Sequence, residues 1–322
     1  MSFYARPIAT KNGRRVMKRI FPKLAAVAIV LAMCLGAPVV YANRPIMDPG
    51  PDNGHDKKKM EGEGGHKTIP PTPVCPVHIT QPGNYDLAGP VGPCPTGVNG
   101  IDIEASNVTL HLNGFSINQS TPCTGDGIHV ENQANPAAML SEVHVLGPGM
   151  INDFFSGLMS KNAADSFVKQ VMATCQTGRG HGFRITSRGG RWKIQGNVFR
   201  NGTPQQFCAI TLFTDDNDVI GNDLNDPICF DGNNNTIVNN TSSGGDAGME
   251  GFSGSINNEI HANTTDNNIF FGISIDAGST GNNITGNESS NNHPDMEDDN
   301  PNCDSNKWEG NHFNTASQTC IH

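Results

Sequence analysis

Four carboxylates crowd into the nine residues "DDNDVIGND", Asp215–Asp223. Such a run could bind a hard cation, because Ca²⁺ takes several carboxylate oxygens at once. Asp216 and Asp218 fit two positions of a calcium-binding loop, but Pro227 stands where that loop needs a bidentate carboxylate. A calcium site could instead combine residues of neighbouring turns of the chain, and its candidate ligands are Asp216, Asp218 and Asp231. The alternative is that these carboxylates are solvated turn residues.

Positive charge is concentrated just before this acidic run, in residues 179–200. Guanidinium groups pair with carboxylates in a bidentate way, and an exposed indole can stack on a sugar ring. The candidate residues for binding an acidic polysaccharide are therefore Arg184, Arg188, Arg191, Lys193 and Trp192. The alternative is ion pairing between residues of neighbouring turns, which contributes little stability at a surface.

A repeat places these residues in a regular framework. The pattern N-x-Φ-x-x-N, where Φ is apolar, recurs in "NDVIGN", "NTIVNN", "NEIHAN", "NNITGN" and "NKWEGN", and "WKIQGN" precedes them with Trp in the first place. The last asparagine of each copy falls at Asn197, Asn222, Asn240, Asn263, Asn287 and Asn311. A spacing of about two dozen residues is typical of one turn of a β-solenoid.

The stretches between the asparagines agree with this interpretation. They are short apolar alternations such as "GIDIEA", "GIHVEN", "CAITLF" and "FGISID", separated by Gly, Asn and Asp. Only residues 162–174 resemble a short amphipathic helix. Stacked turns would give continuous parallel sheets around an enclosed apolar core. The predicted fold is all-β, a right-handed parallel β-helix of roughly ten turns, with capped ends.

Two segments also resemble a known group of proteins. "IDIEASNVTLHLNGFSI", Ile101–Ile117, and the closing "DMEDDNPNCDSNKWEGNHFNTASQTCI" are similar to the right-handed parallel β-helix repeat proteins that bacteria export, within the pectate-lyase-like fold group. The resemblance covers roughly residues 75–322. It implies the fold but not an activity, because the group includes lyases, hydrolases, epimerases and members without a known role.

No complete catalytic motif accompanies the resemblance. The β-helix polygalacturonases combine the motifs N-T-D, D-D, G-H-G and R-I-K in that order. Here "GHG" lies at Gly180–Gly182, "RIT" follows it at once and "TDD" comes later, at Thr214–Asp216. The order and spacing differ, and the lysine is missing. Catalytic residues therefore stay unassigned, the sequence favours a protein that is not an enzyme, and calcium is the only cofactor that it suggests.

The cysteines indicate end clamps. Eight cysteines lie after residue 42, an even number that is typical of disulfide bonding in an oxidising compartment. The open sheet edges at the two ends of a solenoid must be covered to prevent pairing with other chains. We therefore expect Cys75 to pair with Cys94 and Cys303 with Cys320, so that each bond holds a cap in place. Cys208 and Cys229 are nearly one turn apart and could also bond. We expect Cys123 and Cys175 to lie about two turns apart, which is awkward for a direct bond and leaves buried free thiols as the alternative.

The first 74 residues are predicted to be a signal peptide followed by a tether. Residues 1–42 combine basic residues, an apolar run and a "VYA" cleavage pattern, which predicts a signal peptide, with Met17 as an alternative start. Residues 43–74 are rich in Pro, Gly and charge, which predicts a disordered tether. His55 and His66 in this tether could hold a metal loosely, but solvated side chains are the simpler interpretation. Residues 75–322 form the predicted domain, with caps at 75–100 and 295–322.

The net charge and the predicted fold limit the kinds of function that the chain can have. The chain without its leader has 14 Lys and Arg against 31 Asp and Glu, a net charge of −17, which repels nucleic acid. We expect a periplasmic, cell-surface or extracellular binding or scaffold module that contacts acidic polysaccharide, with no permanent membrane span. The alternatives are a lyase, hydrolase or epimerase of uronate polymers, or a purely structural surface protein. A shared groove for Arg184, Arg188, Asp216 and Asp231 would favour binding or catalysis.

Overall fold

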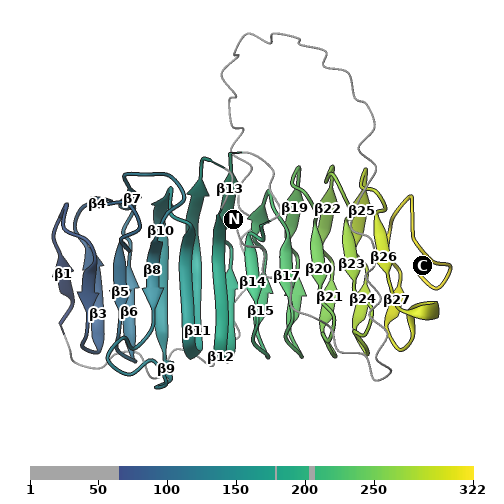
Figure 1. The fold of residues 1–322 in the computed structure, drawn as a ribbon, viewed down its shortest axis with the longest axis horizontal. Coiled ribbons are helices and arrows are strands. Elements are labelled where there is room, and N and C mark those ends of the chain that lie inside the picture. Colours follow the sequence, from purple (N-terminus) through teal and green to yellow (C-terminus); the bar gives the residue numbers. More distant parts are fainter. Residues whose placement is uncertain (1–64, 178–179, 203–206) are drawn as a thin grey trace, which may run out of the picture. The chain divides into compact units, whose positions relative to one another are not determined.

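A computed structural model describes residues 65–177, 180–202 and 207–322. These residues form a parallel β-helix of about nine turns, which confirms the fold that the asparagine repeat predicts. Strands of successive turns pair in parallel and follow one another along the long axis of Figure 1. The predicted signal peptide and most of the predicted tether lie outside the described residues.

Three faces, here called sheets 1, 2 and 3, run along the solenoid. Sheet 1 contains β2 (Val77–Ile79), β5 (Ile101–Ile103), β8 (Asp126–Val130), the first parts of β11 (Ser156–Cys175) and β12 (His181–Gln195), β14 (Ile210–Leu212), β17 (Ile228–Phe230), β20 (Met249–Gly251), β23 (Ile273–Ile275) and β26 (Met296–Asp298). Because each strand of this face pairs with the next turn, the face is one continuous parallel sheet.

The two other faces are built in the same way. Sheet 2 contains β1 (Lys67–Ile69), β3 (Gly83–Leu87), β6 (Val108–His111), β9 (Leu140–Ser141), the first part of β10 (Val143–Asn152), the middle of β11, the second part of β12, β15 (Asp218–Ile220), β18 (Thr236–Val238), β21 (Glu259–His261), β24 (Asn283–Thr285) and β27 (Lys307–Glu309). Sheet 3 contains β4 (Val91–Cys94), β7 (Ser116–Gln119), the ends of β10 and β11, β13 (Val198–Asn201), β16 (Asp223–Leu224), β19 (Thr241–Ser243), β22 (Thr264–Asp266) and β25 (Glu288–Ser290).

Helical structure is almost absent from the described part of the chain. The short 3₁₀ helix η1 (Pro301–Cys303) lies near the C-terminal end. Residues 162–174, which resemble an amphipathic helix in the sequence, belong to β11, and buried side chains alternate along part of this segment as a strand requires. Among the described residues, no helix has the length and apolar character needed to cross a membrane.

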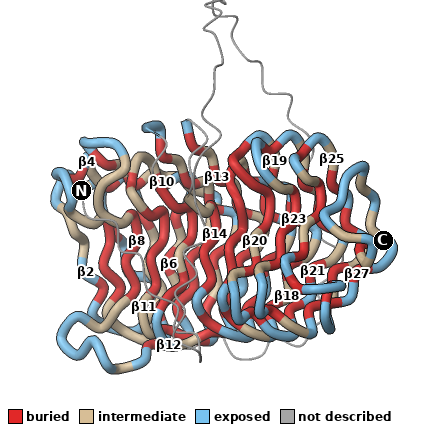
Figure 2. The backbone as a smooth tube through the Cα atoms, turned by 45° about the vertical axis from the view of Figure 1, so that its right-hand side comes forward, coloured by how far each residue is buried: buried red, intermediate tan, exposed pale blue. Residues whose placement is uncertain are grey.

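The core follows from the alternation of side chains along each strand. In sheet 2 the central residues stack in register from turn to turn and are buried: Val219, Ile237, Ile260, Ile284 and Trp308. Figure 2 shows buried residues along the strands and exposed residues concentrated at the turns. Each inward side chain therefore packs against its equivalents above and below, which no single turn could provide.

The last asparagines of the repeat form a buried ladder at the bend between sheets 2 and 3. From Asn197 to Asn287, each side-chain amide donates to the Oδ1 atom of the next asparagine, over 2.9 to 3.1 Å. The backbone N–H of each asparagine donates to the same oxygen, and each amide also donates to a backbone carbonyl of the preceding turn, such as Val219 O for Asn240. The vertical alignment of these asparagines, which the repeat predicts, is confirmed.

The first asparagines of the repeat form a second ladder at the bend between sheets 1 and 2. Its members are Asn217, Asn235, Asn258, Asn282 and Asn306. Trp192 precedes them in the first place of the motif, and its backbone N–H donates to Asn217 Oδ1 at 3.0 Å. This ladder therefore begins where the tryptophan replaces an asparagine.

The solenoid begins earlier than the sequence suggests. Residues 65–74 were expected to belong to the tether, but β1 pairs with β3 and the side chain of Ile69 is buried. The bridge between Thr72 and Val91 adds a contact on sheet 3. The polar composition of these residues gives no sign of this turn in the sequence. One buried isoleucine and backbone pairing to the next turn are enough to hold an edge strand.

Four disulfide bonds join the eight described cysteines. The expected pairs Cys75–Cys94 and Cys303–Cys320 are present, and Cys208 also bonds to Cys229.

The pairing of Cys123 and Cys175, which the sequence leaves open, is a disulfide bond with a Cα–Cα distance of 5.4 Å, so the alternative of buried free thiols is excluded for this pair. The backbone N–H of Cys123 donates to Asp153 O of the following turn, at 2.6 Å. The loop before β8 therefore leans along the rod far enough for Cys123 to reach Cys175.

We predict that Asn240→Ala lowers the free energy of unfolding by about 3 kcal/mol, because the buried N–H and amide of Asn222 lose their shared acceptor and Asn263 loses a donor. Equilibrium unfolding in urea measures this change. The exposed Asn314→Ala serves as the matched control, with an expected change near zero. Equal effects of the two substitutions would contradict a stabilising role of the ladder.

We also predict that replacing both Cys123 and Cys175 by alanine lowers the free energy of unfolding by about 4 kcal/mol, since the bond closes a loop of 52 residues. Peptide mapping of the non-reduced wild type should yield a fragment that contains both cysteines. Recovery of either cysteine as a free thiol from the folded, unreduced protein would disprove the bond.

Candidate functional site

The predicted basic patch is divided between two faces of the solenoid. Arg184 lies on the outer side of sheet 1, while Lys193 lies on sheet 2 in register with Asp218. Arg188 is exposed between these two positions. Arg191 is already engaged, because its Nε and Nη2 atoms donate to the carboxylate of Asp165 at 2.5 and 2.7 Å. These side chains do not converge on one groove.

Trp192 is not available as a stacking surface. Its side chain has no exposed area, and the indole N–H donates to Ala163 O at 3.1 Å. The expectation of an exposed binding tryptophan is therefore wrong. The alternation along β12 turns this residue inward, between the exposed Arg191 and Lys193.

The predicted calcium ligands are also not assembled. Asp218 lies on sheet 2, Asp231 follows β17 on sheet 1, and Asp216 lies in the bend between them, where its carboxylate accepts from Asn234 at 3.3 Å. Burial raises the pKa of Asp231, and of Asp218 against the opposing effect of Lys193. Among the described residues, two other groups bring three potential metal ligands within 4.8 Å of one another: His66, Asp86 and His111, and His78, Asp102 and Glu104.

The outer face of sheet 1 carries two columns of aligned side chains. The first column is formed by one outward residue of each strand: His78, Asp102, His129, Met159, Arg184, Thr211, Cys229, Glu250, Ser274 and Glu297. The second column lies two residues later in each turn, and its C-terminal half contains Phe213, Asp231, Phe252, Asp276 and Asp299. A linear ligand lying along the solenoid would contact residues of both columns, one turn after another.

Several charged side chains in the N-terminal half of this face already have partners. His129 contacts Asp126 at 2.7 Å through Nδ1 and Glu131 at 2.9 Å through Nε2, and Lys161 also pairs with Glu131. Burial lowers the pKa of His129, but the two carboxylates raise it to above its usual range in sum. The imidazole is therefore held between two acids, and Lys161 offsets part of their charge.

Arg184 and an aromatic cluster occupy the middle of the face. The rings of Phe155, His181 and Phe207 contact one another edge-on, with centroids 5.4 to 6.0 Å apart. Burial and the nearby Arg184 lower the pKa of His181 to about 4, so this imidazole is neutral at physiological pH. The Nε atom of Arg184 is buried and has no hydrogen-bond partner among the described residues.

The C-terminal half of the face carries carboxylates without basic partners. Glu250, Asp276, Glu297 and Asp299 lie on three consecutive turns of sheet 1. Residues 201–322 contain 18 Asp and Glu and the single basic residue Lys307, which pairs with Glu309 on sheet 2. No lysine or arginine of this half therefore offsets the negative charge on sheet 1.

This crowding changes the protonation of the carboxylates. Burial, together with the charges of Asp276 and Glu297, raises the pKa of Glu250 to about 7. Burial and Asp299 raise the pKa of Asp276 and of Glu297 as well. A carboxyl group that keeps its proton near neutral pH, beside ionised neighbours, can act as a general acid.

Two phenylalanines lie beside these carboxylates. Phe213 is 42% exposed, and its ring centroid is 6.4 Å from that of Phe252 with the planes tilted by 35°. Phe252 is partly buried and belongs to the same column as Asp276. The face therefore combines apolar ring surface with carboxylates, two features suited to the C–H groups and hydroxyls of a sugar.

This carboxylate group forms no local motif in the sequence, although its spacing carries a signal. Glu250, Ser274 and Glu297 are separated by 24 and 23 residues, which matches the spacing of the asparagine repeat. Extending the repeat to outward positions would have aligned them. Asp295 and Asp298, close to Glu297 in the sequence, are buried and accept hydrogen bonds from residues of the C-terminal segment, so they stabilise this end of the solenoid.

Comparisons with known proteins give no family assignment. No protein-family model matches the chain, and no curated protein is similar to it. Among solved structures, the crystal structure of the Dettilon tailspike protein (gp208) is similar with a TM-score of 0.46 and 17% sequence identity. The alignment covers 76% of this chain and 52% of the tailspike chain, so the chain spans about half the length of that protein.

We predict that Glu250→Gln raises the thermal unfolding midpoint at pH 8 and leaves it nearly unchanged at pH 4. Folding raises the pKa of Glu250 from 4.5 to about 7, so its contribution to stability is lost as pH rises from about 4.5 to 7, and the loss is complete at pH 8, while at pH 4 the group is mostly neutral in both states. Glutamine resembles the neutral form at every pH. Glu259→Gln, at an exposed position of β21, is the matched control. An equal midpoint shift at both pH values would contradict the raised pKa.

Proposed function

We propose that the protein binds an extended extracellular polysaccharide along the outer face of sheet 1 and hydrolyses it at Glu250, Asp276, Glu297 and Asp299. The observation that carries this proposal is the placement of these four carboxylates on three consecutive turns, beside the rings of Phe213 and Phe252 and without a lysine or arginine partner.

The geometry of the face suits a linear polymer. Equivalent residues of neighbouring turns lie about 4.8 Å apart, a spacing similar to the length of one sugar unit. Phe213 and Phe252 offer ring surfaces on which the apolar face of a sugar can lie. Successive sugar units can therefore meet equivalent positions of successive turns, with the aromatic pair next to the carboxylates.

The carboxylates supply the two groups that glycoside hydrolysis requires. Glu250, whose pKa is raised to about 7, donates its proton to the glycosidic oxygen as the bond between that oxygen and the anomeric carbon breaks. Asp276 on the next turn accepts a proton from the water that adds to the anomeric carbon. The charges of Asp276 and Glu297 oppose ionisation of Glu250 and so help to keep its proton in place. Asp299 raises the pKa of Asp276, which makes the carboxylate of Asp276 a stronger base.

The electrostatics favour an uncharged polysaccharide over a uronate polymer at these carboxylates. A polymer that carries its own carboxylates would be repelled by 18 acidic residues opposed by a single lysine in residues 201–322. The acidic polysaccharide suggested by the basic patch would have to bind near Arg184, the one member of that patch on the outer side of sheet 1. Non-catalytic binding of this kind remains the second candidate, supported by the buried Arg184 Nε atom without a described partner.

Incubation of the full chain with neutral and uronate polysaccharides, with and without calcium, tests the proposal. We expect release of new reducing ends from a neutral polymer, with a rate that falls above pH 7 as Glu250 loses its proton. Glu250→Gln should lower this rate about a hundredfold or more, because it removes the general acid. Phe252→Ala should weaken retention on the polymer.

Glu259→Gln on sheet 2 is the control and should leave the rate unchanged. Undiminished hydrolysis by Glu250→Gln would show that the chemistry occurs elsewhere. Retention without new reducing ends would leave only a binding module, and growth of ultraviolet absorbance on a uronate polymer would indicate elimination instead of hydrolysis.

A further inference from the structure

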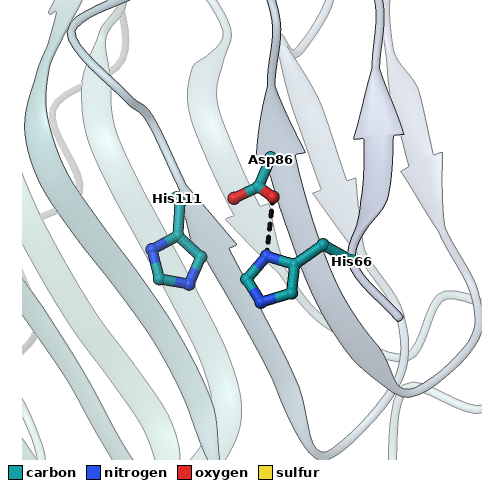
Figure 3. A group of neighbouring side chains, drawn as sticks. All are labelled: His66, Asp86 and His111. Carbon is teal, nitrogen blue, oxygen red and sulfur yellow. Dashed lines mark hydrogen bonds and ion pairs between the residues drawn. The ribbon is translucent and has the colours of Figure 1, made fainter. Parts of the chain in front are cut away.

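Three potential metal ligands meet at the N-terminal edge of sheet 2, away from the carboxylates of sheet 1. Asp86 of β3 and His111 of β6 are direct partners in the register of the sheet, and His66 precedes β1 on the turn before. Their potential ligand atoms all lie within 4.8 Å of one another. Figure 3 shows the side chains of all three pointing toward one shared space.

The three side chains of this group already lie close to one another. His66 Nδ1 lies 2.6 Å from Asp86 Oδ2, and the two imidazole rings have centroids 5.7 Å apart with a tilt of 30°. The other oxygen of Asp86 accepts from the side-chain amide of Asn113 at 3.4 Å. Burial alone would raise the pKa of Asp86, but the hydrogen bonds from His66 and Asn113 and the two nearby imidazoles lower it, so the carboxylate is ionised at neutral pH.

The donor set favours one class of metal ion. Two imidazole nitrogens and one carboxylate oxygen suit Zn²⁺, which commonly takes three protein ligands and a water molecule. Ca²⁺ and Mg²⁺ prefer shells of oxygen ligands, which this group does not offer. We propose that His66, Asp86 and His111 bind a zinc ion on the outer surface of sheet 2.

The other three-ligand group of the described residues is less suited to a metal. Both oxygens of Asp102 accept hydrogen bonds at 2.9 Å, one from Asn99 and one from Gln133. His78 Nδ1 contacts Glu104 at 2.7 Å but is 3.8 Å from Asp102. A metal ion there would have to displace established hydrogen bonds, whereas Asp86 loses only its contact with His66.

A zinc ion at this position would fasten the first turn of the solenoid. β1 is an edge strand that pairs with β3 over three residues, and such edges open more easily than interior strands. Coordination would connect the residue before β1 to both β3 and β6. Binding would therefore stabilise the N-terminal edge and decrease as pH falls, because imidazole must lose its proton to coordinate zinc.

Titration of the metal-free full chain with zinc, followed by calorimetry, tests the proposal. The protein must be prepared without a polyhistidine tag. We expect saturable binding of one zinc ion at pH 7.5 and a higher thermal unfolding midpoint, with both effects lost at pH 5. His66→Gln and His111→Gln should each weaken binding about tenfold or more. His261→Gln, on the same sheet but far along the solenoid, is the matched control and should bind zinc as the wild type does.

Cobalt(II) in place of zinc provides a second measurement that needs no variant, because its visible absorption reports nitrogen and oxygen ligands in a site of low coordination number. Unchanged zinc affinity in both His66→Gln and His111→Gln would overturn the proposal. Loss of binding in His78→Gln alone would move the site to the other group and overturn it equally. Failure of the wild type to bind zinc saturably would also be decisive.

Discussion

Two buried asparagine ladders join the turns of the solenoid from Asn197 to Asn311. A solenoid must bend its backbone between sheets in every turn, and each bend removes N–H and C=O groups from water. From Asn197 onward, one carboxamide satisfies the bend of its own turn and joins it to the next. A bend of different shape would misalign the sheets on both sides. The ladders therefore keep the outward columns of sheet 1 in register, and so position Glu250 relative to Asp276 and Glu297.

The repeat made the fold predictable, because N-x-Φ-x-x-N states both the position of the bend and the inward residue beside it. The same pattern correctly places Trp308 in the core, where it is buried. Trp192 stands in the first place of the motif, where the asparagines are also buried, and it is buried as well, so its position beside basic residues was misleading. The Cys123–Cys175 bond was not predictable from spacing, since it depends on a loop that leans toward the next turn.

The candidate site was less predictable because local clustering of charge is a poor guide in a solenoid. Residues that are close in the sequence can lie on different parts of the solenoid: Asp216 lies in a bend and Asp218 lies on sheet 2. Glu250 and Glu297, in contrast, are 47 residues apart in the sequence but belong to the same column of sheet 1. The His66–Asp86–His111 group has the same character, with one ligand from each of three successive turns. In this fold, chemistry is assembled at intervals of one turn, and a scan for dense motifs finds mainly solvated bends.

The direction of the ladder between sheets 2 and 3 has a consequence for self-association. Within the ladder, every carboxamide from Asn197 to Asn287 donates one amide N–H to the oxygen of the following asparagine, and the oxygens from Asn222 onward accept from the preceding one, so these hydrogen bonds all run in one direction. Such a stack could in principle extend from molecule to molecule, head to tail. At the C-terminal end, however, the amide and the backbone N–H of Asn311 face the carbonyl oxygen of His322, at 3.4 and 3.5 Å. That oxygen takes the place of a further asparagine, so a second copy would have to displace it before a fibre could grow from this end.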